Sequence, residues 1–177
     1  MPITGEKGKI YDIDWRRAED LITQAKENLG IEVQKAENIE ELCACDILCT
    51  ATPSSTPLIF GASVRQGTHI NAIGSNAPNR QEIDSSVLIK SKVYVDRLEQ
   101  ALEEAGDLII PIKQGLYKAE SIAGNLCDVL SGRIAGRDDE SQITLFKSVG
   151  IALEDIAVAR KAYELALKKG IGQELTL

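Results

Sequence analysis

A short run of small polar residues after an apolar strand is the part of the sequence best suited to hold a ligand. The predicted strand Ile70–Ile73 leads directly into Gly74, Ser75 and Asn76. Parallel α/β sheets place ligand sites at the carboxyl ends of their strands. Gly74 has no Cβ to keep a ligand from the main chain, and the next two residues carry short hydrogen-bonding side chains. We therefore expect a binding site at the end of this strand.

Asp12 occupies a similar position after another apolar segment, the short predicted strand Lys9–Tyr11. In a dinucleotide-binding fold, an acidic residue at this point accepts hydrogen bonds from the adenosine ribose hydroxyls. Such a residue also repels the 2′-phosphate of NADP, so Asp12 favours NAD. The alternative is a solvated aspartate at a strand-to-helix turn.

Hydroxyl side chains follow two further predicted strands. Thr52 and Pro53 come after the buried strand Asp46–Ala51, where a hydroxyl can meet a cofactor phosphate or ribose. The alternative is a turn that caps whatever follows. Ser148 joins the strand Ile143–Phe146 to the last helix, where it can hold an anion or a nicotinamide amide together with free helix amides. The alternative for Ser148 is a simple helix cap.

The other residues capable of acid–base or metal chemistry give weaker signals. His69, the only histidine, begins its strand at the end away from Asn76, which favours a structural role. Three of the four cysteines lie between positions 43 and 49, but their spacing fits no common zinc template. We expect packed free thiols and no metal site. Glu82 and Asp84 are expected on a solvated helix face.

Apolar strand segments alternate with helical periodicity along most of the sequence. The predicted strands are Lys9–Tyr11, Ile31–Val33, Asp46–Ala51, Ile70–Ile73, Lys92–Val95 and Ile143–Phe146. The predicted helices are Trp15–Leu29, Asn38–Cys43, Arg80–Ile89, Glu99–Ala105, Ala119–Leu130 and Gly150–Lys169, with Ile110–Gly115 as a loop. Strands separated by helices indicate an α/β fold with a doubly wound, mostly parallel sheet.

Length and charge limit the classes of function. The 177 residues suit one domain of ordinary size, and the net charge of −7 argues against a nucleic-acid or membrane-surface binder. No apolar run approaches the length of a membrane span, and the first residues contain no apolar signal core. We expect a cytoplasmic protein that binds small molecules.

Taken together, these segments resemble the family of ornithine cyclodeaminase, mu-crystallin and the archaeal-type alanine dehydrogenases. The matching stretches are Asp46–Ser54 with Pro57-Leu58, Gly67–Asp84, Gly106–Leu108 and Ile143–Asp155, within a resemblance that runs from Lys9 to Gly170. The resemblance implies a Rossmann domain that binds NAD(H) or NADP(H). It places Asp12 and Ile13 at the adenosine ribose, Thr52 and Pro53 along the dinucleotide, Ile73 and Ser75 near the nicotinamide, and Ser148 over it.

The sequence departs from the family pattern near its start. The family has a glycine-rich turn after its first Rossmann strand, whereas Gly5 and Gly8 here follow no apolar strand. We therefore expect residues 1–149 to form a partial NAD(P)-binding Rossmann domain without that strand and turn. Residues 150–177 are expected to form a helix and tail that pack on the family's N-terminal substrate and dimerisation domain, which has no counterpart here.

The absence of a first strand has a structural consequence. In the strand order 3-2-1-4-5-6, strand 1 lies between the strands Lys9–Tyr11 and Asp46–Ala51. Each of these then has an unpaired edge. We hypothesise that the sheet rearranges, gains a partner strand or is only marginally stable.

Asn76 is a second departure, since the cyclodeaminases have a catalytic aspartate at this position. An amide cannot act as a carboxylate base. The resemblance therefore favours an amino-acid dehydrogenase or ketimine reductase, which transfers hydride at an amino or imino carbon, over ornithine cyclodeaminase. A non-catalytic interaction protein is the other alternative. The expected partners are a small amino acid or cyclic imine, and a second copy or another chain that supplies the missing domain.

Overall fold

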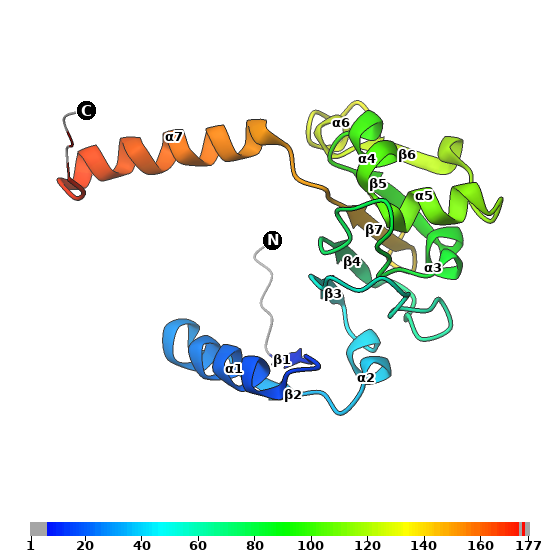
Figure 1. Ribbon diagram of the computed structural model, residues 1–177, viewed down its shortest axis with the longest axis horizontal. Coiled ribbons are helices and arrows are strands. Elements are labelled where there is room, and N and C mark those ends of the chain that lie inside the picture. The colour runs from blue at the N-terminus through cyan, green and yellow to red at the C-terminus, as the bar shows by residue number, and fades with distance from the viewer. Residues whose placement is uncertain (1–6, 174, 176–177) are drawn as a thin grey trace.

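The computed structural model describes residues 7–173 and 175, in which strands and helices alternate (Figure 1). The strands are β1 (Lys7–Ile10), β2 (Glu32–Lys35), β3 (Ile47–Thr50), β4 (His69–Ala72), β5 (Ser91–Val95), β6 (Ile122–Asn125) and β7 (Ile143–Lys147). The helices are α1 (Trp15–Leu29), α2 (Ile39–Cys43), α3 (Ser85–Lys90), α4 (Leu98–Glu104), α5 (Gly106–Lys113), α6 (Leu126–Leu130) and α7 (Ala152–Lys169), with the 3-10 turn η1 (Ala119–Ser121).

Five of the strands form one parallel sheet in the order β3-β4-β7-β5-β6. Its middle strands carry the core, because Ile70, Leu145 and Val93 lie in register across them and are fully buried. Helices α3, α4 and α5 add apolar side chains to the same core, among them Leu88 and Leu108. The predicted parallel α/β fold is confirmed.

The first two strands form a separate parallel pair that carries α1 (Figure 1). Asp14 caps the start of α1 by accepting a hydrogen bond from the Arg16 N–H at 3.1 Å, and Gly30 ends it with a φ of 65°. An ion pair between Lys9 and Glu41 links β1 to α2. Among the described residues, β1 pairs only with β2 and β3 only with β4, so the expected unpaired edges are present.

Gly8 does not form a turn between these two sheets. Gly8 lies within β1, and Gly5 lies outside the described residues.

Two predicted elements were wrong. Most of the segment expected as a loop, Ile110–Lys113, belongs to α5, which starts at Gly106 directly after the end of α4. A Cβ at Gly106 would lie 1.9 Å from the carbonyl oxygen of Arg80, so tight packing explains this glycine. The long helix predicted over residues 119–130 is divided into η1, β6 and α6, because Gly124 has a φ of 145° that no helix contains.

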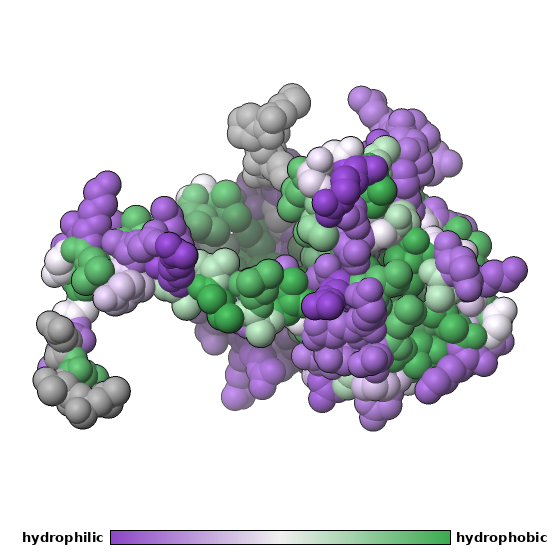
Figure 2. Space-filling view, turned by 90° about the horizontal axis from the view of Figure 1, so that it is seen from above, coloured by the Kyte–Doolittle hydropathy of each residue, from purple (hydrophilic) through white to green (hydrophobic). Residues whose placement is uncertain are grey.

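Helix α7 confirms the predicted last helix but stands apart from the sheet (Figure 1). None of its side chains is buried, although Leu153, Ile156 and Leu167 are large and apolar. Hydrophobic and hydrophilic residues both lie along its visible face in Figure 2. Within residues 7–173, no helix combines the length and the apolar composition needed to cross a membrane.

Candidate functional site

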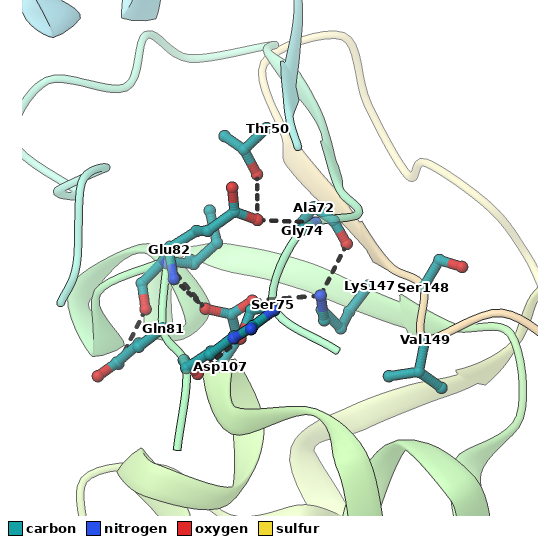
Figure 3. Close-up of polar contacts among 12 residues, drawn as sticks. Thr50, Ala72, Gly74, Ser75, Gln81, Glu82, Asp107, Lys147, Ser148 and Val149 are labelled. Carbon is teal, nitrogen blue, oxygen red and sulfur yellow. Dashed lines mark hydrogen bonds and ion pairs between the residues drawn. The ribbon is translucent and has the colours of Figure 1, made fainter. Parts of the chain in front are cut away.

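The loops that follow β3 and β4 are held together by one carboxylate (Figure 3). Oε1 of Glu82 accepts a hydrogen bond from the Thr52 N–H at 2.6 Å. Oε2 accepts one from the Gly74 N–H at 2.9 Å and another from the Thr50 hydroxyl at 3.0 Å. Hydrogen bonds to a buried carboxylate are stronger than those between neutral groups. Glu82 therefore fixes the two loops relative to each other.

The expectation that Glu82 lies on a solvated helix face was wrong. The Glu82 side chain is fully buried, and Glu82 precedes α3, which begins only at Ser85. Asp84 instead caps α3 by accepting a hydrogen bond from the Ser86 N–H at 2.8 Å. The polar segment before α3 is therefore a folded loop that directs one carboxylate inward.

Gly74 is required by the packing of the same two loops. A Cβ at this position would lie 2.3 Å from both the main-chain nitrogen and the oxygen of Thr52. It would also lie 2.7 Å from Oε1 of Glu82. The close approach expected between Gly74 and a ligand is thus made by the neighbouring loop.

A buried ion pair supports the Glu82 segment from below (Figure 3). Oδ1 of Asp107 accepts hydrogen bonds from the main-chain N–H groups of Glu82 at 2.7 Å and Ile83 at 2.9 Å. Its Oδ2 lies 3.3 Å from Nζ of Lys147, and Lys147 also donates to the carbonyl oxygen of Ala72 at 3.0 Å. The pair therefore connects the end of β7 with α5 and with the loop that carries Glu82.

Burial acts on the two charges of this pair in opposite directions. Burial raises the pKa of Asp107, while Lys147 and the two N–H donors oppose that change. Burial lowers the pKa of Lys147, and Asp107 opposes that change. Each side chain thus opposes the effect of burial on the pKa of the other. Neither residue was predicted from the sequence, although a lysine that directly follows an apolar strand segment is an available signal.

A second carboxylate organises the ends of β5 and β7. Oδ2 of Asp96 accepts hydrogen bonds from the Ser148 hydroxyl at 3.0 Å and from the N–H groups of Val149 and Gly150, both at 2.8 Å. Asp96 is buried. Asp96 was not predicted as a site residue either, although it follows an apolar strand just as Asp12 does.

The structure brings six of the predicted site residues to one edge of the five-stranded sheet. They follow the carboxyl ends of the adjacent strands β3, β4 and β7, and they are Thr52, Pro53, Ile73, Ser75, Asn76 and Ser148. Pro53, Ile73 and Asn76 are exposed, whereas Thr52 and Ser148 are half-buried. Ser75 is fully buried and donates its hydroxyl hydrogen to the Arg80 carbonyl at 2.6 Å.

The other two predicted residues belong to the smaller sheet. Asp12 and Ile13 follow the carboxyl end of β1. Oδ1 of Asp12 accepts a hydrogen bond from the Asp14 N–H at 2.7 Å, and Ile13 is 96% exposed. His69 begins β4 at the opposite end from Asn76, with Nδ1 2.8 Å from the Thr144 hydroxyl oxygen.

The chemistry of this edge is that of binding rather than of proton transfer. Exposed apolar groups of Pro53 and Ile73 lie among the hydroxyls of Thr52 and Ser148, while the nearby carboxylates are buried in main-chain hydrogen bonds. Within the described part of the chain, no three His, Cys, Asp or Glu residues are grouped to hold a metal ion. The edge therefore offers apolar contacts and hydroxyl groups to a ligand.

Comparison with known proteins gives consistent similarities. The model of the ornithine cyclodeaminase/mu-crystallin family matches residues 4–170. A Delta(1)-pyrroline-2-carboxylate reductase of Bacillus cereus is 44% identical over 173 residues, which are 96% of this chain and 53% of the relative.

Two solved structures are similar over almost the whole chain. Thermococcus litoralis Delta(1)-pyrroline-2-carboxylate reductase in complex with NADH and L-proline gives a TM-score of 0.91 at 40% identity, covering 96% of this chain and 53% of that one. An archaeal alanine dehydrogenase dimer with bound NAD gives 0.86 at 36% identity, covering 97% and 52%. The chain thus spans about half the length of the relatives it matches.

Proposed function

Because the chain belongs to the ornithine cyclodeaminase/mu-crystallin family, we propose that it is the nicotinamide-cofactor-binding part of an oxidoreductase. The observation that carries the proposal is the junction at Glu82, where one buried carboxylate holds the strand-end loops at Thr52 and Gly74. Ligands of doubly wound sheets bind outside the carboxyl ends of the strands. A rigid pair of loops at that edge is what an extended dinucleotide requires.

The residues at this edge fit the parts of such a cofactor. Thr52 and Pro53 line the dinucleotide, Ile73 and the main chain at Ser75 face the nicotinamide, and Ser148 closes over it. Exposed Ile73 offers an apolar surface for a planar ring, and the Ser148 hydroxyl is oriented by Asp96. When bound, a nicotinamide cofactor supplies the hydride, and the protein supplies its orientation.

Asp12 and Ile13 bind the adenosine ribose in this proposal, and Asp12 selects NAD over NADP. Asp12 follows β1, as the acidic ribose ligand of a dinucleotide fold follows its strand. Its carboxylate repels a 2′-phosphate. The archaeal dehydrogenase and the Thermococcus reductase, which are described with NAD and NADH, support this choice of cofactor.

The proposed reaction is hydride transfer at the amino or imino carbon of a small amino acid or cyclic imine, as in amino-acid dehydrogenases and ketimine reductases of cytoplasmic amino-acid metabolism. Asn76 is exposed at the site edge, where an amide cannot act as the carboxylate base of a cyclodeaminase. This residue favours the reductase over the cyclodeaminase. In this proposal the substrate is held by the part of the family's length that this chain does not span, against which α7 packs.

Amide-resolved NMR of the nitrogen-labelled chain during titration with NADH tests the proposed cofactor position. We expect saturable shifts of the Thr52 and Ile73 amide signals, while that of Cys127, on α6, remains unchanged. Shifts confined to residues away from the carboxyl edge would reject the proposed position.

A further inference from the structure

The hydrogen of the Ser148 hydroxyl is committed to Asp96, and we propose that Asp96 thereby makes the site select a ring carboxamide over a ring carboxylate. Asp96 acts through Ser148, so it is a positioning residue in this role. The inference rests on the proposed function, since it needs the nicotinamide ring to lie beside Ser148. It adds which group of the cofactor Ser148 recognises and which residue sets that preference.

The hydrogen bonds of Ser148 determine what its hydroxyl can offer to a ligand. A serine hydroxyl has one hydrogen to donate and two lone pairs that accept. Its oxygen lies 3.0 Å from Oδ2 of Asp96, and a carboxylate oxygen only accepts, so the hydroxyl hydrogen points to Asp96. The Gly150 N–H donates to the same hydroxyl oxygen at 3.2 Å. Half-buried Ser148 therefore has one lone pair left, and it presents an acceptor to the ligand.

Asp96 is fixed in the position that this arrangement requires. Its Oδ2 also accepts hydrogen bonds from the N–H groups of Val149 and Gly150, both at 2.8 Å, and its Oδ1 accepts one from the Arg97 N–H at 2.9 Å. Gly150 has a φ of 81°, a conformation that glycine adopts without strain. The buried Asp96 side chain cannot turn away from Ser148 without losing these main-chain hydrogen bonds.

The free lone pair of Ser148 lies next to the apolar surface proposed for the ring. The Ser148 N–H donates to the carbonyl oxygen of Ala72 at 3.1 Å, so Ser148 adjoins the end of β4, where exposed Ile73 follows. Figure 3 shows Ser148 directly after Lys147 at the end of β7. A ring that packs on Ile73 thus has a hydrogen-bond acceptor beside it.

A carboxamide and a carboxylate interact with this acceptor in opposite ways. The carboxamide donates through its NH2 group, which satisfies the remaining lone pair of Ser148. A carboxylate has no hydrogen to donate, and its negative charge would face Asp96, which is buried 3.0 Å from the Ser148 oxygen. The cation of Lys147 is already paired with Asp107. Because like charges repel strongly where water is excluded, the site should reject the carboxylate.

Calorimetric titration of the full chain with three reduced dinucleotides tests the preference. They are NADH, its nicotinic acid analogue, and its 3-acetylpyridine analogue, which is neutral and keeps the carbonyl but lacks the NH2 group. We expect the native chain to bind NADH at least about tenfold more tightly than the acid. It should bind NADH about threefold to tenfold more tightly than the ketone, the range of one hydrogen bond.

Variants of the two residues assign this preference. In Asp96→Asn the new NH2 group donates to Ser148, which frees the hydroxyl hydrogen for the ligand. We expect the ratio of NADH to acid affinity to fall at least about fivefold. Ser148→Ala removes the acceptor, so NADH and the ketone should bind equally. Asp139→Asn is the matched control, because Asp139 also accepts a hydrogen bond from a serine hydroxyl, that of Ser141, but precedes the opposite end of β7.

Ratios of affinities separate this role from a structural one, since a general loss of stability weakens the binding of all three dinucleotides alike. Native ratios in Asp96→Asn, or an equal fall in Asp139→Asn, would overturn the inference and leave the proposed function standing. If Asp96→Asn does not fold, Ser148→Ala decides, and an unchanged preference for NADH over the ketone would overturn the inference. Binding of none of the three dinucleotides by the native chain would reject the proposed function together with it.

Discussion

Nζ of Lys147 lies 3.3 Å from Oδ2 of Asp107, and both side chains are at most 1% exposed. Through the main-chain N–H groups of Glu82 and Ile83, this pair positions the carboxylate that holds the loops at Thr52 and Gly74. The candidate site is therefore built on a continuous set of buried polar contacts that begins at the end of β7. Breaking one contact should affect both stability and the geometry of the loops.

Lys147→Met should destabilise the chain by about 3–5 kcal/mol, because it leaves the Asp107 carboxylate buried without its counter-charge. Adding Asp107→Asn removes that charge and keeps an oxygen for the two N–H donors. The double variant should therefore be more stable than Lys147→Met alone. Urea unfolding measures the free energies, and strictly additive effects would show that the two side chains do not interact.

Glu82→Gln should destabilise the chain by about 1.5–3 kcal/mol, because an amide cannot accept the hydrogen bonds made by both carboxylate oxygens. The amide signals of Thr52 and Gly74 should also move, since both N–H groups lose their charged acceptor. Glu103→Gln, on an exposed position of α4, is the matched control and should change stability by less than about 0.5 kcal/mol. Equal effects of the two variants on stability would show that Glu82 does not hold the loops at Thr52 and Gly74 together.

Gly74→Ala should destabilise the chain by about 1–3 kcal/mol, because the new methyl group overlaps the main chain of Thr52. Gly136→Ala provides the control, since its Cβ would make an ordinary contact of 3.5 Å with Val129. Thermal unfolding compares the two. An unchanged thermal unfolding midpoint for Gly74→Ala would mean that the loops at Thr52 and Gly74 can move apart without loss of stability.

The stability of the chain should rise as the pH increases toward 6.5. Burial lowers the pKa of His69 below its usual 6.5, although a hydrogen bond with Asn71 opposes the change. Between the folded and unfolded pKa values, the unfolded chain binds a proton that the folded chain does not, so acid favours unfolding. Urea unfolding from pH 5 to 8 should show a smaller pH dependence for His69→Gln than for the native chain. An identical pH dependence in the native chain and in His69→Gln would mean that groups other than His69 cause it.

Much of the fold was predictable because hydrophobic patterns in α/β chains are strong. The strands near Ile70 and Ile143 and the helix Trp15–Leu29 follow directly from apolar runs and from three- and four-residue spacing. The unpaired edges of β1 and β3 were also predictable, because the strand order determines which strands are neighbours. Failures occurred where local signals conflict with packing, as at Gly106, which lies at the start of α5 and is a glycine because the Arg80 carbonyl leaves no room for a Cβ.

The candidate site was predictable only in part. The strand-end positions of Thr52, Ile73 and Ser148 follow from the sheet, and the structure brings them to one edge. The buried carboxylates of Glu82 and Asp96 were not found, because a carboxylate inside a protein cannot be distinguished by spacing from one on its surface. Their N–H partners come from segments that are distant in sequence, so only the folded chain identifies them.

Fluorescence titration with NADH tests the central claim, that this chain binds a nicotinamide cofactor at its strand ends, most directly. Trp15 is the only tryptophan, three residues from Asp12, so energy transfer to bound NADH should quench its emission. We expect saturable quenching that weakens in Asp12→Ala. It should not weaken in Asp20→Ala, which removes an exposed carboxylate from the helix that carries Trp15. No quenching up to millimolar NADH, or equal quenching in both variants, would contradict the account.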